Sequence, residues 1–277
     1  MANTQLSPAE PLMAGKRGLV MGVANDHSIA WGAARMLAAH GAELAFTYQG
    51  EAFGKRVAPL AESVGSSLVM PCDVEDTATV DKVFDTLENS WGGLDFVVHA
   101  IAYSDKNELK GKYADTTRDN FIRTMVISCF SFTEIAQRAA KLMPNGGSLV
   151  TLTYEGATRV MPNYNVMGVA KAGLESSVRY LASDFGAEGI RVNAISAGPM
   201  RTLAGAGISD ARAMFSFQRK HSPLKRPVAL DEVGGAAVYL LSDLSGGVTG
   251  EIHFVDAGYN IISTPRPEDV NGENGSD

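Results

Sequence analysis

Short apolar runs alternate with longer segments of helical periodicity along nearly the whole chain, and this alternation restricts the possible folds more than any other feature. The apolar runs are residues 17–23, 43–48, 67–72, 94–99, 148–153, 190–195 and 251–255. The helical segments between them are 29–40, 51–64, 77–90, 116–142, 164–185 and 231–241. Runs such as DFVVHA and SLVTLT are apolar without alternation, as expected when helices cover both faces of a sheet. We predict an α/β fold with a doubly wound, seven-stranded parallel sheet of the Rossmann type.

Two segments interrupt this rhythm, residues 103–115 after the fourth run and a helical insertion at about 198–227 after the sixth. Long loops in compact domains usually carry function, and ligands of open α/β sheets bind beyond the carboxyl ends of the strands. We therefore expect both segments, the helical insertion included, to lie beside a bound ligand. Residues 1–264 should form a single domain, and the polar, acidic residues 265–277 should be a disordered tail.

Composition excludes several classes of protein. The chain has 277 residues, 45% of them hydrophobic, which suits one large core, and its net charge of -7 argues against a nucleic-acid binder. Two cysteines and five scattered histidines make neither a disulfide framework nor a zinc site, so no metal is expected. No apolar run reaches the roughly 20 residues of a membrane span, and the first residues lack the order of a signal peptide. We expect a cytoplasmic protein that binds no membrane.

The first strand ends at Gly22, and the sequence GVANDHSIAWG leads from there into a helix. Backbone amides and the helix N-terminus there can receive a pyrophosphate, with Ser28 as N-cap or phosphate ligand. The spacing does not match G-x-G-x-x-G, so an ordinary strand-to-helix turn remains an alternative.

The next two strands end in further candidates for binding a dinucleotide. Gln49 stands where an acid usually holds the adenosine ribose; it is neutral and offers no cation for a 2′-phosphate, which favours NAD. Lys55 and Arg56 lie close enough to keep NADP open. Asp73, followed by Val74, can accept from the adenine amine, or it can simply be the N-cap of the next helix.

Tyr164 and Lys171 carry the sharpest chemical signal. Their separation of seven positions is nearly two helical turns, so both side chains project from one helix face. The ammonium can stabilise a tyrosinate and hold ribose hydroxyls, and the phenol can donate to a developing oxyanion. The alternative is a surface tyrosine and lysine on an amphipathic helix.

With these motifs the chain resembles the short-chain dehydrogenase/reductase superfamily over almost its whole length, and more closely its branch of bacterial enoyl-[acyl-carrier-protein] reductases. Three features carry the resemblance: the loop GVANDHSIA, Tyr154 ten positions before Tyr164, and the segment AGPMRTLA at residues 197–204. Thr151 stands where the superfamily usually has serine. In contrast, residues 99–102 read HAIA and are followed by Tyr103, where the branch often has Ser-Ile-Gly and then Phe.

The resemblance implies hydride transfer from NADH to the β-carbon of a trans-2-enoyl thioester carried by acyl-carrier protein. Tyr164 would hydrogen-bond the enolate oxygen, Lys171 would anchor the nicotinamide ribose, and Tyr154 and Ser104 would contact substrate. The resemblance places the cofactor on Gly22, Ser28, Ile29, Gln49, Asp73, Val74, Ile101, Lys171, Met200, Arg201, Thr202, Leu203 and Ala204. It also implies a homotetramer. A ketoacyl or alcohol dehydrogenase and a non-catalytic nucleotide-binding regulator remain alternatives.

Two groups of side chains in the insertion have an open interpretation. Apolar residues there can form a lid for an acyl chain or can pack in the core; they are Met200, Met214, Phe215 and Phe217. Basic residues there can dock an acidic carrier protein or can be an ordinary solvated face; they are Arg212, Arg219, Lys220, Lys225 and Arg226.

Overall fold

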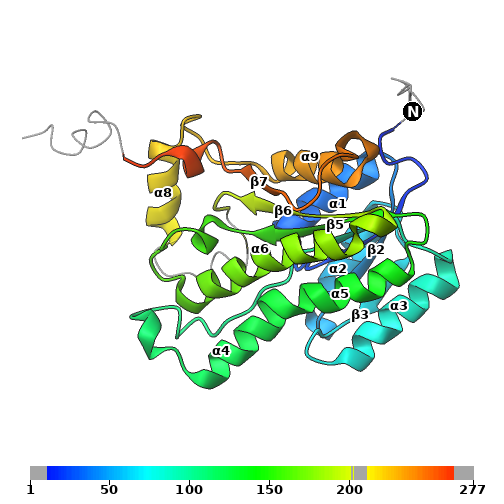
Figure 1. Cartoon of the computed structure of the whole chain (residues 1–277), viewed down its shortest axis with the longest axis horizontal. Coiled ribbons are helices and arrows are strands. Elements are labelled where there is room, and N and C mark those ends of the chain that lie inside the picture. The colour runs from blue at the N-terminus through cyan, green and yellow to red at the C-terminus, as the bar shows by residue number, and fades with distance from the viewer. Residues whose placement is uncertain (1–10, 201, 203–210, 265–277) are drawn as a thin grey trace, which may run out of the picture.

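The computed structural model describes residues 11–200, 202 and 211–264. Within these residues, seven parallel strands form one sheet in the order β3-β2-β1-β4-β5-β6-β7 (Figure 1). The strands are β1 Arg17–Met21, β2 Glu43–Tyr48, β3 Leu68–Pro71, β4 Phe96–His99, β5 Gly147–Thr153, β6 Ile190–Ala197 and β7 Ile252–Val255. The predicted doubly wound, seven-stranded parallel sheet is confirmed.

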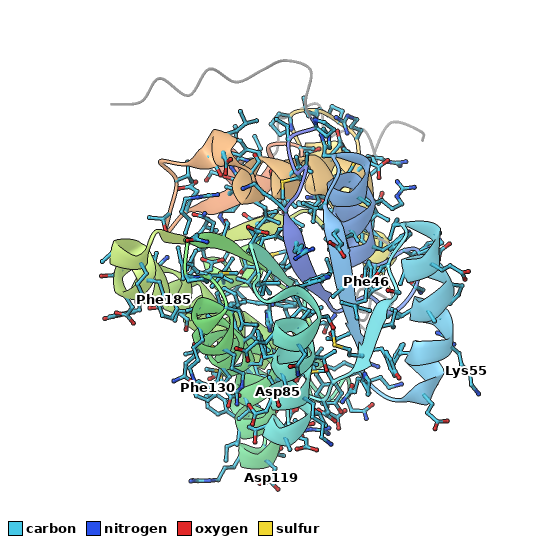
Figure 2. All side chains as sticks on the ribbon, turned by 90° about the vertical axis from the view of Figure 1, so that its right-hand side faces the viewer. Phe46, Lys55, Asp85, Asp119, Phe130 and Phe185 are labelled. Atoms are coloured by element: carbon cyan, nitrogen blue, oxygen red, sulfur yellow. The ribbon has the colours of Figure 1, made fainter. Side chains whose placement is uncertain are left out.

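Helices cover both faces of the sheet, as the apolar strands require. They are α1 Ile29–Ala39, α2 Glu51–Ser63, α3 Thr77–Trp91, α4 Arg118–Met125, α5 Ser131–Lys141, α6 Asn165–Phe185, α8 Ala211–His221 and α9 Leu230–Leu241. Helices α1, α2 and α9 pack on one face, and α3, α5 and α6 pack on the other. Figure 2 shows Phe46 at the sheet and Lys55 on the outer side of α2. The two layers bury separate hydrophobic cores, so the sheet is solvent-free on both sides.

The helix expected over residues 116–142 runs from residue 118 to residue 141 and contains a π turn. Helix α4 is followed by a π-helical segment, Val126–Phe130, and only then by α5. A π turn inserts one extra residue per turn and rotates the side chains after it, which sequence periodicity does not resolve. The predicted long helix is thus confirmed over residues 118–141, with a π turn that the prediction did not include.

The carboxyl ends of β1 and β4 define the place where a ligand is expected. The chain winds from β1 outward to β3, then crosses to β4 and winds outward in the opposite direction. At such a switch the loops after adjacent strands diverge and leave a crevice. The loops after these two strands carry Gly22 and Ile101, and Figure 1 shows α8 at the end of the sheet toward which β6 points. None of the helices in the described part of the chain is long and apolar enough to cross a membrane.

Candidate active site

The loop after β1 brings two backbone segments into close contact. Gly22 has a φ of +96°, and a Cβ on it would collide with the carbonyl oxygen of Ala100, the residue after β4. An L side chain would therefore be strained by conformation and excluded by space. Glycine here keeps the ends of β1 and β4 close together under the crevice.

Ser28 occupies the N-cap position of α1, but its hydroxyl bonds no amide of that helix. Instead its Oγ accepts from the backbone amides of Ala24 (3.0 Å) and Asn25 (3.1 Å), which shapes the loop. The first turn of α1 contains no acidic residue. The N-terminus of α1, where Ile29 begins the helix, thus keeps a positive end that suits a phosphate.

Gln49 and Asp73 meet beyond the carboxyl ends of β2 and β3. The Gln49 amide donates to Oδ2 of Asp73 at 3.0 Å, and Oδ1 of Asp73 accepts from the amide of Glu75 at 2.9 Å. The N-cap of α3 is Asp76, whose carboxylate accepts from Ala78 at 3.0 Å. The alternative interpretation of Asp73 as a helix cap is therefore wrong, and its side chain lies beside Gln49. Val74, which follows it, is buried.

A cavity of about 480 Å³ lies between the first loop, the end of β6 and helix α8. His27, Met200, Phe215 and Arg219 are among its lining residues. Met200 also packs against the core beneath α1, and Ile101 packs against the core on the other face. Thr202 donates its amide to the carbonyl of Met200 at 2.8 Å. Three predicted cofactor residues lie outside the described residues: Arg201, Leu203 and Ala204.

Tyr154 and Tyr164 form a pair at the end of β5. Their rings lie edge to face with centroids 5.2 Å apart, and Tyr164 is 8% exposed. Tyr154 directly follows β5, and Tyr164 directly precedes α6. Within the described part of the chain, the enclosed hydroxyl of Tyr154 has no hydrogen-bond partner. A buried, unsatisfied phenol is costly, so this hydroxyl is poised for a polar group of a ligand.

The backbone on either side of Tyr164 is left-handed. Asn163 has a φ of +58° and Asn165 a φ of +36°. Asparagine tolerates this conformation better than other residues with a side chain, so the sequence Asn-Tyr-Asn permits a sharp entry into α6. We did not predict a role for these two asparagines from the sequence, although an asparagine on each side of a candidate catalytic residue indicates an unusual backbone conformation there.

Lys171 lies on α6 and is only 6% exposed. Its ammonium donates to the carbonyl of Leu152 at 2.8 Å, which anchors it to β5, two residues before Tyr154. Burial lowers the pKa of Lys171 to about 8, against opposing effects of Cys129 and Glu175. Glu175, one turn further along α6, accepts from Thr153 at 2.8 Å and is a neighbour that the sequence analysis missed. Its position four residues after Lys171 on the same helix could have predicted that the two side chains are neighbours.

Electrostatics keep both tyrosines protonated. Burial raises the pKa of Tyr164, and Tyr154 and Glu175 raise it further. Burial and Glu155 raise the pKa of Tyr154. The expectation that Lys171 holds Tyr164 as a tyrosinate is not what this arrangement favours, because desolvation dominates. Tyr164 is instead a neutral phenol that can donate a hydrogen bond.

Ser104 and Tyr103 follow β4 and face α4. The Ser104 hydroxyl accepts from Thr124 at 2.9 Å and lies 3.3 Å from Oδ1 of Asn120. Tyr103 is 41% exposed, and the guanidinium of Arg123 stacks 4.5 Å from its ring centre. The Ser104 hydroxyl is thus hydrogen-bonded within the protein, and the Tyr103 ring is partly exposed to solvent.

The basic residues of the insertion have different surroundings. Arg226 forms a two-point ion pair with Glu232 (2.6 and 2.8 Å), whereas the exposed Arg219 lines the cavity. The side chain of Arg212 lies outside the described residues. Across the described residues no three metal-ligating side chains come together.

The sheet order, the glycine loop and the tyrosine–lysine pair define a reductase of the short-chain dehydrogenase/reductase class. A family model described as enoyl-(acyl carrier protein) reductase matches residues 22–260. The chain is 74% identical to enoyl-[acyl-carrier-protein] reductase [NADH] 2 of Rhizobium meliloti over 257 residues, covering 93% of this chain and 96% of that protein. The chain therefore belongs to the enoyl-(acyl carrier protein) reductase family.

Solved structures agree. The enoyl-(acyl-carrier-protein) reductase of Anaplasma phagocytophilum in complex with NAD has a TM-score of 0.90 and 58% identity, with 93% of this chain and 98% of that chain covered. The Bacillus cereus enoyl-acyl carrier protein reductase with NADP+ and indole naphthyridinone also has a TM-score of 0.90, at 49% identity, with 91% of this chain and 99% of that chain covered. The fold and the class of site are thus shared with enzymes that bind a nicotinamide dinucleotide.

Proposed function

We propose that this protein reduces the trans-2 double bond of enoyl thioesters carried by acyl-carrier protein, with NADH as reductant. The observation that carries the proposal is the ring contact of the half-buried Tyr154 with the buried Tyr164 directly after β5, together with the buried Lys171 bonded to Leu152 of that strand. Reduction adds a hydride to the β-carbon and a proton to the α-carbon, and NADH when bound supplies that hydride.

The residues at the crevice fit a dinucleotide. The side chain missing at Gly22 and the acid-free first turn of α1 suit a pyrophosphate. Gln49, Asp73 and Val74 would hold the adenosine, and Ile101 and Lys171 would hold the nicotinamide half. The remaining proposed cofactor contacts are Ser28, Ile29, Met200, Arg201, Thr202, Leu203 and Ala204. The orphaned hydroxyl of Tyr154 provides an independent sign that a polar ligand completes this site.

NADH is favoured over NADPH by the end of β2. Gln49 carries no charge there, and its amide already donates to the carboxylate of Asp73. A 2′-phosphate beside Asp73 would meet like charge. Arg56 instead lies 6.0 Å over the ring of Phe53, and Lys55 points away from the sheet (Figure 2).

Tyr164 has the central chemical role in this mechanism. As negative charge develops on the thioester oxygen, its protonated phenol donates a hydrogen bond and stabilises the enolate. Lys171, fixed by the carbonyl of Leu152, would hold the ribose hydroxyls of the nicotinamide half through its ammonium. Tyr154 and Ser104 line the acyl pocket, and Tyr154 offers its free hydroxyl to the substrate.

We further propose a cytoplasmic homotetramer in which residues 1–264 form one domain. Two separate faces expose apolar side chains: Ile122, Phe130, Val169 and Tyr180 on one, and Tyr239, Leu244 and Phe254 on the other. Two distinct interfaces are what a closed tetramer with two-fold axes needs. The exposed Arg219 beside the cavity supports docking of an acidic carrier protein there.

The test follows reduced-nicotinamide absorbance with trans-2-enoyl and 3-ketoacyl carrier-protein thioesters, each with NADH and with NADPH. We expect oxidation of NADH with the enoyl thioester. Tyr164→Phe should lower kcat by about 10²-fold or more, as loss of an oxyanion donor does, while Tyr180→Phe on the exposed face of α6 should not. Lys171→Ala should abolish activity by weakening NADH binding. Turnover of the ketoacyl thioester alone would indicate a ketoacyl dehydrogenase, and cofactor binding without turnover would indicate a regulator.

A further inference from the structure

His99, the last residue of β4, is completely buried and is not part of the mechanism above. Its Nδ1 lies 3.0 Å from the hydroxyl of Thr151 in β5, and its Nε2 lies 3.0 Å from the hydroxyl of Ser131 at the start of α5. Burial and the charge of Lys171 lower its pKa to about 3, so the imidazole is neutral at physiological pH. A neutral ring with both nitrogens engaged is a fixed bridge between a strand and a helix.

The hydrogen-bond pattern assigns the ring tautomer. The Ser131 hydroxyl donates its single proton to the carbonyl of Ile127 at 2.6 Å. It must therefore accept from the imidazole, which places the ring proton on Nε2. Nδ1 then faces the Thr151 hydroxyl at 3.0 Å, and that hydroxyl shares its single proton between Nδ1 and the carbonyl of His99, to which it donates at 3.1 Å. This is the position where the superfamily usually has serine, and in this chain its hydroxyl faces His99.

The bond from Ser131 to Ile127 ends inside the π segment. One residue after Ile127, the fully buried Ser128 contacts the loop that follows β4. Its hydroxyl accepts from the amide of Tyr103 and donates to the carbonyl of Tyr103, both at 2.9 Å. One side chain thus binds both main-chain groups of Tyr103, directly before Ser104.

The far end of the same loop is held beside the catalytic tyrosine. The side-chain amide of Asn165 donates to the carbonyls of Glu108 (3.4 Å) and Gly111 (3.3 Å). Leu109 is 7% exposed and packs in a cluster with Tyr164. The loop is therefore tied at Tyr103 through the π segment and at residues 108–111 through the start of α6.

We propose that His99 is a positioning residue for the substrate: through Ser131 it holds the π segment, whose Ser128 fixes Tyr103 and Ser104 at the acyl pocket. Ser128 lies within the π segment and reaches the loop, and Ser131 begins α5 directly after the segment and reaches the imidazole. The proposal rests on the proposed function, since the loop is taken to line the pocket of an enoyl substrate.

The kinetic test compares Ser128→Ala with the control Ser177→Ala. Ser177 lies on α6, donates to the carbonyl of Gly173 at 3.0 Å and contacts Cys129 of the same π segment, but it does not touch the loop. Ser128→Ala should raise the KM for enoyl thioester about tenfold, as expected for the loss of two hydrogen bonds. Its kcat and its KM for NADH should stay near wild type. Ser128→Thr, which keeps the hydroxyl, should restore the KM.

His99→Phe tests the more distant member of the chain. It should reproduce the pattern of Ser128→Ala, a higher KM for enoyl thioester with an unchanged KM for NADH. If His99→Phe instead raised the KM for NADH and lowered kcat, His99 would act through β5 and Lys171, and the proposal would be overturned. Equal kinetics of Ser128→Ala and Ser177→Ala would also overturn it.

A measurement without catalysis separates this proposal from the proposed function. Hydrogen–deuterium exchange of residues 100–112 in the free protein should accelerate in Ser128→Ala and in His99→Phe and stay at the wild-type rate in Ser177→Ala. If the wild-type protein were inactive but the variants showed these exchange rates, the proposed function would be refuted and the role of His99 and Ser128 in holding the loop would still be supported. Exchange at the wild-type rate in both variants would refute the positioning role of His99 and Ser128 even if the enzyme were active.

Discussion

The buried side chain of Lys171 affects both the stability of the fold and, in the proposed function, the binding of NADH. Its ammonium is held by the Leu152 carbonyl, yet burial makes the charged form costly and lowers its pKa to about 8. In the unfolded chain the same group keeps a pKa near 10.4. Between these values the unfolded state binds more protons, so this group makes the folded state more stable as pH rises from about 8 toward 10. Binding of NADH should show the opposite dependence, because it uses the charge.

We expect the Kd for NADH to rise several-fold between pH 7 and pH 9 as Lys171 loses its proton. Titration calorimetry at half-unit steps of pH measures this directly. Lys171→Met is the control: its Kd should be higher at pH 7 and flat over the same range. A wild-type Kd that runs parallel to that of Lys171→Met would show that the charge of this lysine does not contribute to binding.

The elements differ in how locally they are determined. Helix α3 begins at Asp76 because the carboxylate satisfies the amide of Ala78, and it ends at Gly92 in a left-handed conformation, φ +70°. Both signals are local and readable. The π turn between α4 and α5 has no such local signal, because Ser128 and Ser131 there bond to residues 25 and 32 positions away in the chain.

Substitutions of Asp73 and Asp76, three residues apart before α3, should have different effects, one on NADH binding and the other on stability. Asp76→Ala removes the helix cap and should cost about 1 kcal/mol of unfolding free energy with an unchanged KM for NADH. Asp73→Ala removes the partner of Gln49 and should raise the KM for NADH several-fold. Urea unfolding and initial-rate kinetics on both variants test the assignment, which would be wrong if Asp76→Ala changed the KM and Asp73→Ala did not.

At the scale of the whole molecule, the two exposed apolar faces lie on different elements. One is formed by α4, the π segment and α6, and the other by α9, β7 and the turn between them. Phe130, on the first face, is 53% exposed (Figure 2). A side chain of this kind is costly in water and favourable in an interface. The arrangement supports assembly through both faces.

Phe130→Glu should divide a wild-type tetramer into dimers, because it places charge in one interface and leaves the other intact. Sedimentation velocity resolves the two species of the 29.3 kDa chain. Lys55→Glu, a charge change on the exposed outer side of α2, should leave the tetramer unchanged. A wild-type protein that sediments as a monomer would refute the tetramer itself.

The sequence alone predicted the seven strands and their parallel order of winding, because a strand buried on both faces must be apolar throughout. It also predicted that Tyr164 and Lys171 act together, from their spacing on one helix; Tyr164 instead precedes α6, and their joint role stays a prediction. Gly22, Ser28, Gln49, Asp73 and Val74 were predicted from their places after the strands, whereas Tyr154 and the other cofactor residues came from the resemblance to a family. Their place at the crevice is consistent with the described residues, and their roles stay predictions.

Only the tertiary structure decided which polar groups meet across elements. Gln49 donates to Asp73 rather than standing alone, Arg226 is neutralised by Glu232, and His99 bridges Thr151 and Ser131. Most of these partners lie far apart in the chain, and their meeting depends on strand register and on the rotation of a helix at its π turn. The local sequence does not specify which of these polar side chains will meet. The hydrophobic pattern determines which face of an element is buried, and the hydrogen-bond partners depend on how the buried elements pack against one another.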